Sequence, residues 1–190
     1  KENTITPNWN IEYLDFVGNY NFDQYSPEST LSNFDFSFGN DGYELIVMDG
    51  EYIKFFSLSG AYDLREVTYK GYVSVTGHGT LLTVQYIDNG NKIGLSLRDS
   101  GEYLRVLLLS SAYNPQSTGI TVGKSVGDNS SPYYSQDGTK VWLTNGTTNI
   151  YEHSLSTAFF PATLQPYSHA AGLGIDADIV GSLAGGETTT

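Results

Sequence analysis

The chain has 190 residues, with 21 acidic and nine basic side chains, and its formal net charge is −12. This excess of negative charge repels phosphate backbones and anionic membrane surfaces at long range, which argues against nucleic acid and membranes as partners. The chain contains no cysteine, so disulfides, thiolate metal sites and cysteine nucleophiles are excluded.

Aromatic residues and glycine dominate the rest of the composition. Fifteen tyrosines, nine phenylalanines and 21 glycines accompany only 16% charged residues. Aromatic residues favour pleated strands and glycines supply the positive φ angles of tight turns, so this composition predicts an all-β chain. No apolar run approaches the roughly 18 residues of a membrane-spanning helix.

The chain order predicts an extension, three repeats and a tail. Residues 1–32 form the N-terminal extension, in which residues 13–32 read like the connection preceding a repeat. Residues 33–169 hold three β repeats, and residues 170–190 form a C-terminal tail. The repeats are "NDGYELIVMDGEYIKFFSLSGAY" at 40–62, "DNGNKIGLSLRDSGEYLRVLLLSSAY" at 88–113 and "QDGTKVWLTNGTTNIYEHSLSTAF" at 136–159. Their turn glycines, Gly42, Gly90 and Gly138, lie 48 residues apart in both intervals, a regularity that is hard to obtain by chance.

Each unit opens with an Asp-Gly or Asn-Gly pair, which readily takes the positive φ values of a two-residue hairpin turn. The turn-forming residues are Asp41, Gly42, Asn89, Gly90, Asp137 and Gly138. The turns join short aromatic strands to second strands, namely residues 34–38 to 43–48, 83–87 to 92–97, and 132–135 to 140–144. A second turn sends the chain back along residues 52–58, 103–109 and 150–155 toward a shared "LS-(S/T/G)-A-(Y/F)" corner.

A unit of about 40 to 50 residues with three or four antiparallel strands is the signature of a β-propeller blade. The units also resemble the "DGTK…YxLSTxF" repeats in propeller-like modules of bacteriophage virion and marine bacterial surface proteins, and the third unit matches best. The resemblance covers roughly residues 34–165. It implies a virion location, with secretion or the cell surface as the alternative.

Three blades do not close a ring, because propellers need about four to eight. A fourth, degenerate blade could be assembled from the two chain ends, copies could associate, or the units could stack without closing. Because an open array leaves strand edges to be paired or covered, we expect association with other copies or with other virion proteins. The alternative fold is a β-sandwich or jelly roll, which would not explain the equal glycine spacing.

The sequence predicts no catalytic, metal or cofactor site, and therefore no enzyme. His78, His153 and His169 fall at different repeat positions, so they form no metal-ligand spacing. Asp176 and Asp178 in "GIDADIV" lack the remaining ligands of a calcium loop. Hydrolysis by paired carboxylates is a weaker hypothesis, because the aspartates at the repeat turns already have a turn-forming role.

The aromatic residues support a binding hypothesis. Tyr133, Tyr134 and Trp142 in the third unit would stack on sugar rings if they gathered on one rim with Tyr43, Tyr52 and Tyr62 of the first. The alternative is that these rings fill the space between adjacent blades. From the lack of a predicted catalytic site and the resemblance of the repeats to modules of phage proteins, we predict a non-enzymatic structural or attachment component of a phage particle. A carbohydrate-binding propeller module, with surface glycans as partners, is the second hypothesis.

Overall fold

The computed structural model describes residue 22 and residues 34–98, 102–121, 123–126, 131–144 and 149–172. The remainder of the predicted N-terminal extension lies outside these residues, as do Asp176, Asp178 and the rest of the tail beyond residue 172. The described part is built from strands and three short 3-10 segments. None of its helices is long and apolar enough to cross a membrane.

The strands form three antiparallel sheets. The first contains β1 (Phe34–Gly39), β2 (Glu44–Asp49), β3 (Tyr52–Leu58) and β4 (Val67–Ser74). The second contains β5 (Thr80–Ile87), β6 (Lys92–Arg98), β7 (Glu102–Leu109) and β8 (Ser117–Ile120), and β9 (Lys124–Ser125) also pairs with β7. The third contains β10 (Pro132–Tyr134), β11 (Lys140–Thr144), β12 (Asn149–Leu155) and β13 (Leu164–Gly172). Each sheet has the connectivity of a blade, with neighbouring strands in chain order, so the predicted propeller-like fold is confirmed.

The predicted first three strands of every unit are confirmed, and each blade has a fourth strand in a segment after the corner where no strand was predicted. β4, β8 and β13 each pair with the returning strand of their own blade. Their burial pattern explains why the sequence signal was weak. Most residues of β4 alternate between exposed and partly buried, and three of the four residues of β8 are exposed. An outer strand therefore needs few apolar residues.

The glycine turns are longer than the predicted two-residue hairpins. Gly39 pairs with Glu44 and Ile87 pairs with Lys92, so four residues make each connection in the first two blades. Asp41 and Asn89 have φ angles of 51° and 49°. Short polar side chains tolerate this left-handed conformation, and the following glycine has no Cβ to oppose it. The positive φ values were thus predicted correctly for the first two turns, whereas in the third turn Gly138 has a positive φ of 69° and Asp137 does not. The predicted turn length was wrong.

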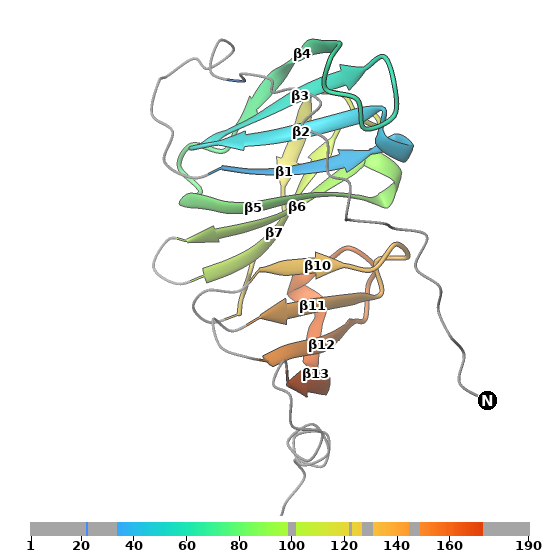
Figure 1. Cartoon of the computed structure of the whole chain (residues 1–190). Coiled ribbons are helices and arrows are strands. Elements are labelled where there is room, and N and C mark those ends of the chain that lie inside the picture. The colour runs from blue at the N-terminus through green and yellow to red at the C-terminus, as the bar shows by residue number, and fades with distance from the viewer. Residues whose placement is uncertain are drawn as a thin grey trace, which may run out of the picture.

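The three sheets lie one after another (Figure 1). Apolar side chains fill both junctions between them. The first junction includes Ile46, Met48 and Phe55 from the first blade against Leu95 and Tyr86 from the second. Buried side chains of the second and third blades form the second junction: Ile87, Leu104, Val106, Tyr134, Val141, Leu143, Leu155 and Phe159. A middle sheet covered on both faces requires strands without strict alternation, which explains the continuous apolar run of β7.

Side chains of one blade also hold the backbone of the next. The Ser37 hydroxyl accepts a hydrogen bond from the Tyr86 N–H at 3.1 Å. At the same position one repeat later, the Gln85 side-chain oxygen accepts from the Tyr134 N–H at 2.9 Å. Both contacts span 49 residues, so the 48-residue period of the sequence is also the period of the blade junctions. The inner strands β1, β5 and β10 consequently follow one another along the stack.

Candidate functional site

The candidate site lies where the glycine turns of the three blades converge, and it begins with a repeated corner. The residue ending the first unit's corner, Tyr62, donates its backbone N–H to the Gly42 carbonyl at 2.8 Å. The corresponding residues are Tyr113, which donates to Gly90, and Phe159, which donates to Gly138. All three aromatic residues have left-handed φ angles, and each ring occupies the space that a Cβ on its glycine would need. The glycines are therefore required by ring packing as well as by backbone conformation.

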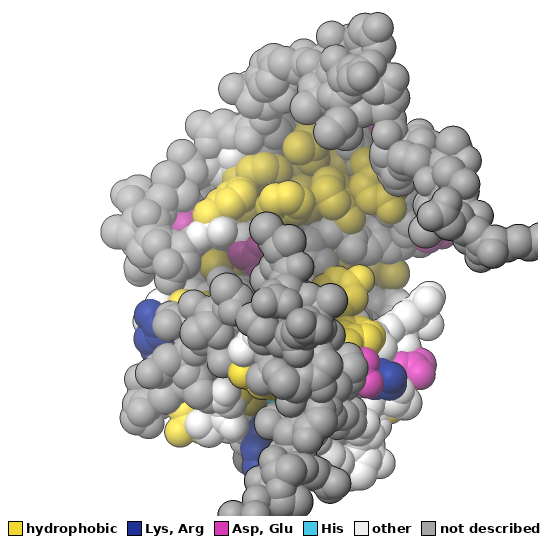
Figure 2. All heavy atoms as spheres, turned by 60° about the horizontal axis from the view of Figure 1, so that its bottom comes forward, with side chains coloured by type: hydrophobic (Ala, Val, Ile, Leu, Met, Phe, Trp, Pro, Cys, Tyr) yellow, Lys and Arg dark blue, Asp and Glu magenta, His cyan; other side chains and the backbone are white. Residues whose placement is uncertain are grey.

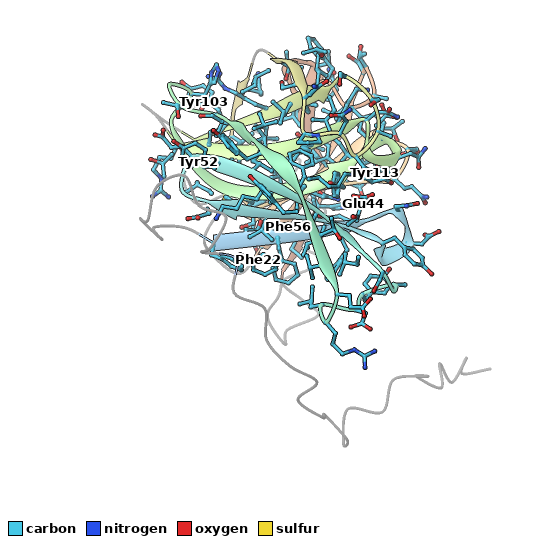
Figure 3. All side chains as sticks on the ribbon, turned by 90° about the horizontal axis from the view of Figure 1, so that it is seen from above. Phe22, Glu44, Tyr52, Phe56, Tyr103 and Tyr113 are labelled. Atoms are coloured by element: carbon cyan, nitrogen blue, oxygen red, sulfur yellow. The ribbon has the colours of Figure 1, made fainter. Side chains whose placement is uncertain are left out.

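A hollow of about 440 Å³ opens between the corners of the first two blades and residues 133–136 of the third, and we call it the blade-end pocket. The first blade contributes Asp41 and Tyr62 to it, the second contributes Asp88 and Asn89, and the third contributes Tyr133 and Gln136. The pocket volume falls within the range of about 300 to 1,000 Å³ that small-molecule sites occupy. Figure 3 shows that Tyr113 and Glu44 lie toward this end of the sheets, whereas Tyr52 and Tyr103 lie toward the opposite end.

Some polar groups of the blade-end pocket already form hydrogen bonds within the protein, and others form none with another described residue. The Gln85 side chain forms two such bonds: its oxygen accepts from the Tyr134 N–H, and its amide nitrogen donates to the Tyr134 carbonyl at 3.3 Å. The Asp88 carboxylate accepts from the Lys92 ammonium at 2.6 Å. By contrast, Asp41, Asn89 and Gln136 have exposed side chains with no hydrogen bond to another described residue. These three side chains, one from each blade, are therefore free to bind a ligand from solvent.

Tyr133 and Tyr134, predicted together as ring-stacking residues, lie on opposite sides of β10. Both residues belong to the pocket lining, but Tyr133 is 63% exposed, whereas Tyr134 is 2% exposed and its ring packs against Gly94 in the second blade. Alternation along a strand separates neighbouring residues in this way. Burial raises the pKa of the Tyr134 hydroxyl above its ordinary value, as it does for Tyr86 at the same position one repeat earlier. Tyr134 is thus a junction residue and is unavailable to a surface ligand.

The third predicted stacking residue, Trp142, belongs to a neighbouring surface. Its ring lies 6.1 Å from that of Tyr133, and its indole N–H donates to the Glu152 carboxylate at 3.0 Å. Lys140 donates to the other oxygen of Glu152 at 2.8 Å. Trp142 does not line the blade-end pocket. We refer to Tyr133, Trp142, Glu152 and Lys140 as the third-blade face.

The aromatic residues that the sequence proposed in the first unit are also separated. Only Tyr62 joins the blade-end pocket. Tyr43 is 46% exposed but does not line it. Tyr52 lies at the far end of the sheet, where its ring contacts Tyr72 at 5.4 Å. The sequence did not single out Gln136 or Tyr113, although both follow from the repeat, since Gln136 precedes a turn Asp-Gly pair and Tyr113 ends a corner.

Asp137 stabilises the third turn directly. Its carboxylate accepts hydrogen bonds from the Ser135 hydroxyl at 2.6 Å, the Thr139 N–H at 3.1 Å and the Thr139 hydroxyl at 2.9 Å. These donors lower the pKa of Asp137 from 3.8 to about 2. Every donor belongs to the same turn, so this carboxylate is committed to local structure.

The histidines take separate contacts. His78 lies 3.2 Å from the Arg105 guanidinium, and the His153 ring is 2.9 Å from the Gln165 carbonyl. Within the described residues, no three histidine or carboxylate side chains come together as potential ligands of a metal ion. His169 belongs to β13 of the third blade.

Comparison with known proteins leaves the family open. No protein-family model matches the chain, and no curated protein matches it. Among solved structures, the chain is similar to the β-propeller domain of Cps50 (Swd1) from Myceliophteria thermophila, at 12% identity and a TM-score of 0.39. The match covers 73% of this chain and 57% of that structure, so the chain spans little more than half of that domain.

Proposed function

We propose that this protein is a non-enzymatic structural or attachment component of a phage particle, which assembles with further copies or other virion proteins through its β repeats. The supporting observation is the first blade's inner strand, β1. Asp35 and Ser37 on this strand accept hydrogen bonds from Val84 and Tyr86 of the second blade. Because side chains alternate along a strand, Phe34, Phe36 and Phe38 project to the side away from the second blade.

The equivalent positions of the second blade support the idea that this side of β1 packs against another blade. Val84 and Tyr86 lie 48 residues after Phe36 and Phe38, and they are 4% and 8% exposed because the preceding blade covers them. Phe36, at the same place in the first blade, is 53% exposed, and its neighbour Phe34 is 57% exposed. Hydrophobic side chains gather into a continuous band on the face shown in Figure 2. Exposed aromatic residues on an open strand favour association with another β element.

The proposed location in a phage particle rests on the sequence resemblance of the repeats to modules of phage proteins. The experiment compares the native mass of the full chain with that of the double variant Phe34→Ser/Phe36→Ser. The proposal expects a concentration-dependent assembly that the double variant weakens, whereas Tyr72→Ser, at an exposed tyrosine of β4, leaves it intact. Detection of the protein in purified particles by mass spectrometry tests the location. A chain that stays monomeric and is absent from particles would contradict the proposal.

A carbohydrate-binding module is the second candidate, and the third-blade face favours it. Tyr133 presents an exposed ring supported by Trp142, and charged oxygen and nitrogen atoms of Glu152 and Lys140 lie beside them. An aromatic surface beside hydrogen-bonding groups suits a sugar, which has both apolar C–H faces and hydroxyls. A glycan array with the full chain tests this candidate, and absence of any signal argues against it.

A further inference from the structure

We infer that the blade-end pocket binds an uncharged saccharide, and that this pocket, rather than the third-blade face, is where such a ligand is held. The inference rests on the carbohydrate-binding candidate and names its site and ligand class. Three blades contribute to the pocket, so it exists only when the repeats are assembled. Its volume of about 440 Å³ is suited to a small ligand.

Two aromatic rings that are fixed before binding flank the pocket. Tyr62 is held by its backbone hydrogen bond to Gly42 and by ring contact with Phe38 at 5.2 Å, yet it remains 63% exposed. Tyr133 is equally exposed and is supported by Trp142. Tyrosine offers a large contact area at a low entropic cost, particularly when its rotamer is already restricted. These rings can pack against the C–H faces of a sugar.

The polar groups of the pocket match a ligand with many hydroxyls. Asp41 offers a carboxylate, while Asn89 and Gln136 offer amide groups that both donate and accept. Since none of them bonds to another described residue, a ligand would replace only their hydrogen bonds to solvent and would break none between described residues. The three groups come from three different blades, so they can contact different hydroxyls of one ligand.

Charge narrows the ligand class. Among the described lining residues, Asp41 and Asp88 carry carboxylates and none is a lysine or arginine; the Asp88 carboxylate is paired with Lys92, so Asp41 supplies the unpaired negative charge. The whole chain carries a formal charge of −12. Acidic sugars would therefore meet repulsion at long and short range, which leaves uncharged saccharides.

A quaternary ammonium ligand is the competing possibility, because tyrosines and a carboxylate can form a cage for a cation. Such a cage needs several ring faces within about 6 Å of one cation. In the described part of the chain, no ring contact joins Tyr62 to Tyr133, whereas six polar residues line the pocket: Asp41, Gln85, Asp88, Asn89, Ser135 and Gln136. The arrangement resembles a polar cradle with two aromatic sides more than a closed aromatic cage.

The test uses the full chain and saturation-transfer NMR, followed by calorimetry with the best probe. The probes are lactose, cellobiose, mannobiose and diacetylchitobiose as uncharged disaccharides, 3′-sialyllactose as an acidic one, and choline. We expect binding of at least one uncharged disaccharide and none of choline or the acidic sugar. Asp41→Asn and Gln136→Ala each lower the affinity by up to about tenfold, the equivalent of one good hydrogen bond. Both side chains are exposed, and asparagine tolerates the left-handed φ of position 41.

Two control variants separate the possible failures. Tyr43→Ala removes an exposed tyrosine beside the same turn but outside the lining, and it should bind like the unmodified chain. Trp142→Ala removes the ring that supports Tyr133 but leaves the pocket contacts of Asp41 and Gln136 in place, so it should reduce binding without abolishing it. Binding abolished by Trp142→Ala but unaffected by both pocket variants would overturn the pocket while sparing the carbohydrate-binding candidate. Absence of binding to every uncharged disaccharide, or preference for choline, would overturn the ligand class and leave assembly through Phe34 and Phe36 unaffected.

Discussion

Tyr113 and Gly90 contact each other in two ways. The Tyr113 N–H donates a hydrogen bond to the Gly90 carbonyl at 2.8 Å, and the tyrosine ring occupies the space that a side chain at position 90 would need. Both residues have left-handed backbone angles, with φ of 58° and 78°. The Tyr113 hydroxyl then accepts the Asn40 N–H of the first blade at 3.0 Å. One corner thus joins a turn, its own blade and the neighbouring blade.

Gly90→Ala should destabilise the protein more than Gly77→Ala. Both glycines have positive φ angles, 78° and 83°, which cost a side chain about 1 to 2 kcal/mol. Only at Gly90 does the new methyl group also collide with a ring, since nothing lies within 4 Å of a Cβ at Gly77. Overpacking adds about 1 to 3 kcal/mol, to be measured by urea unfolding. Equal losses for the two variants would show that the ring does not constrain Gly90.

Tyr86→Phe should leave the free energy of unfolding unchanged or raise it by about 1 kcal/mol, because the buried Tyr86 hydroxyl has no hydrogen-bond partner. Tyr113→Phe provides the matched control, with a ring 5.1 Å from that of Tyr86. It removes the acceptor of the Asn40 N–H and should cost about 1 kcal/mol. Thermal and urea unfolding of the two variants measure the difference. The opposite order would mean that the Tyr86 hydroxyl is satisfied in solution.

Gln85→Ala should weaken the second blade junction. It removes the acceptor of the Tyr134 N–H and the donor to the Tyr134 carbonyl, and a buried group left without a partner costs about 1 to 3 kcal/mol. Hydrogen exchange of the Tyr134 amide should accelerate in step with the lost stability. Gln116→Ala, at an exposed glutamine of the second blade, is the control and should change neither quantity.

Lys54→Met should be among the most damaging single changes. Lys54 and Asp49 form an ion pair whose side chains are 1% and 3% exposed, and removing one member of a buried pair costs about 3 to 5 kcal/mol. Lys140→Met breaks the pair with Glu152, whose side chains are 45% and 23% exposed, and should cost at most about 1 kcal/mol. Similar unfolding free energies for the two variants would contradict the distinction that burial makes.

Asp137 should make stability fall in acid. Its pKa is about 2 in the folded protein and 3.8 as the ordinary value, so the unfolded chain takes up the proton first as the pH drops. The contribution is fully present above pH 4 and is lost as the pH falls toward 2. Asp137→Asn removes this dependence, while Asp63, whose pKa is also lowered to about 2, affects both proteins alike. Unfolding midpoints between pH 5 and 2 give the comparison, and parallel curves for the two proteins would refute it.

The repeat made much of each blade predictable. Turn glycines at constant spacing, flanked by apolar and aromatic runs, located the first three strands of every unit, because hairpin turns and strands depend on local backbone preferences. The outer strands β4, β8 and β13 were not predicted. β8, for example, consists of "STGI", whose pairing with β7 depends on a long-range partner and not on local preference.

In the candidate site, too, the sequence predicted which residue types are present but not which of them are exposed. Tyr133 and Tyr134 are chemically identical neighbours, and their sequence context did not separate a pocket residue from a junction residue. Alternation requires that they face opposite ways, but only the packing of the third blade against the second decides which of them is buried. The sequence alone determined the period, the positions of the turns and the blade type, because these arise from contacts between near neighbours. The tertiary structure decided which rings meet solvent and that three turns enclose one pocket, because those facts depend on contacts across 48 residues or more.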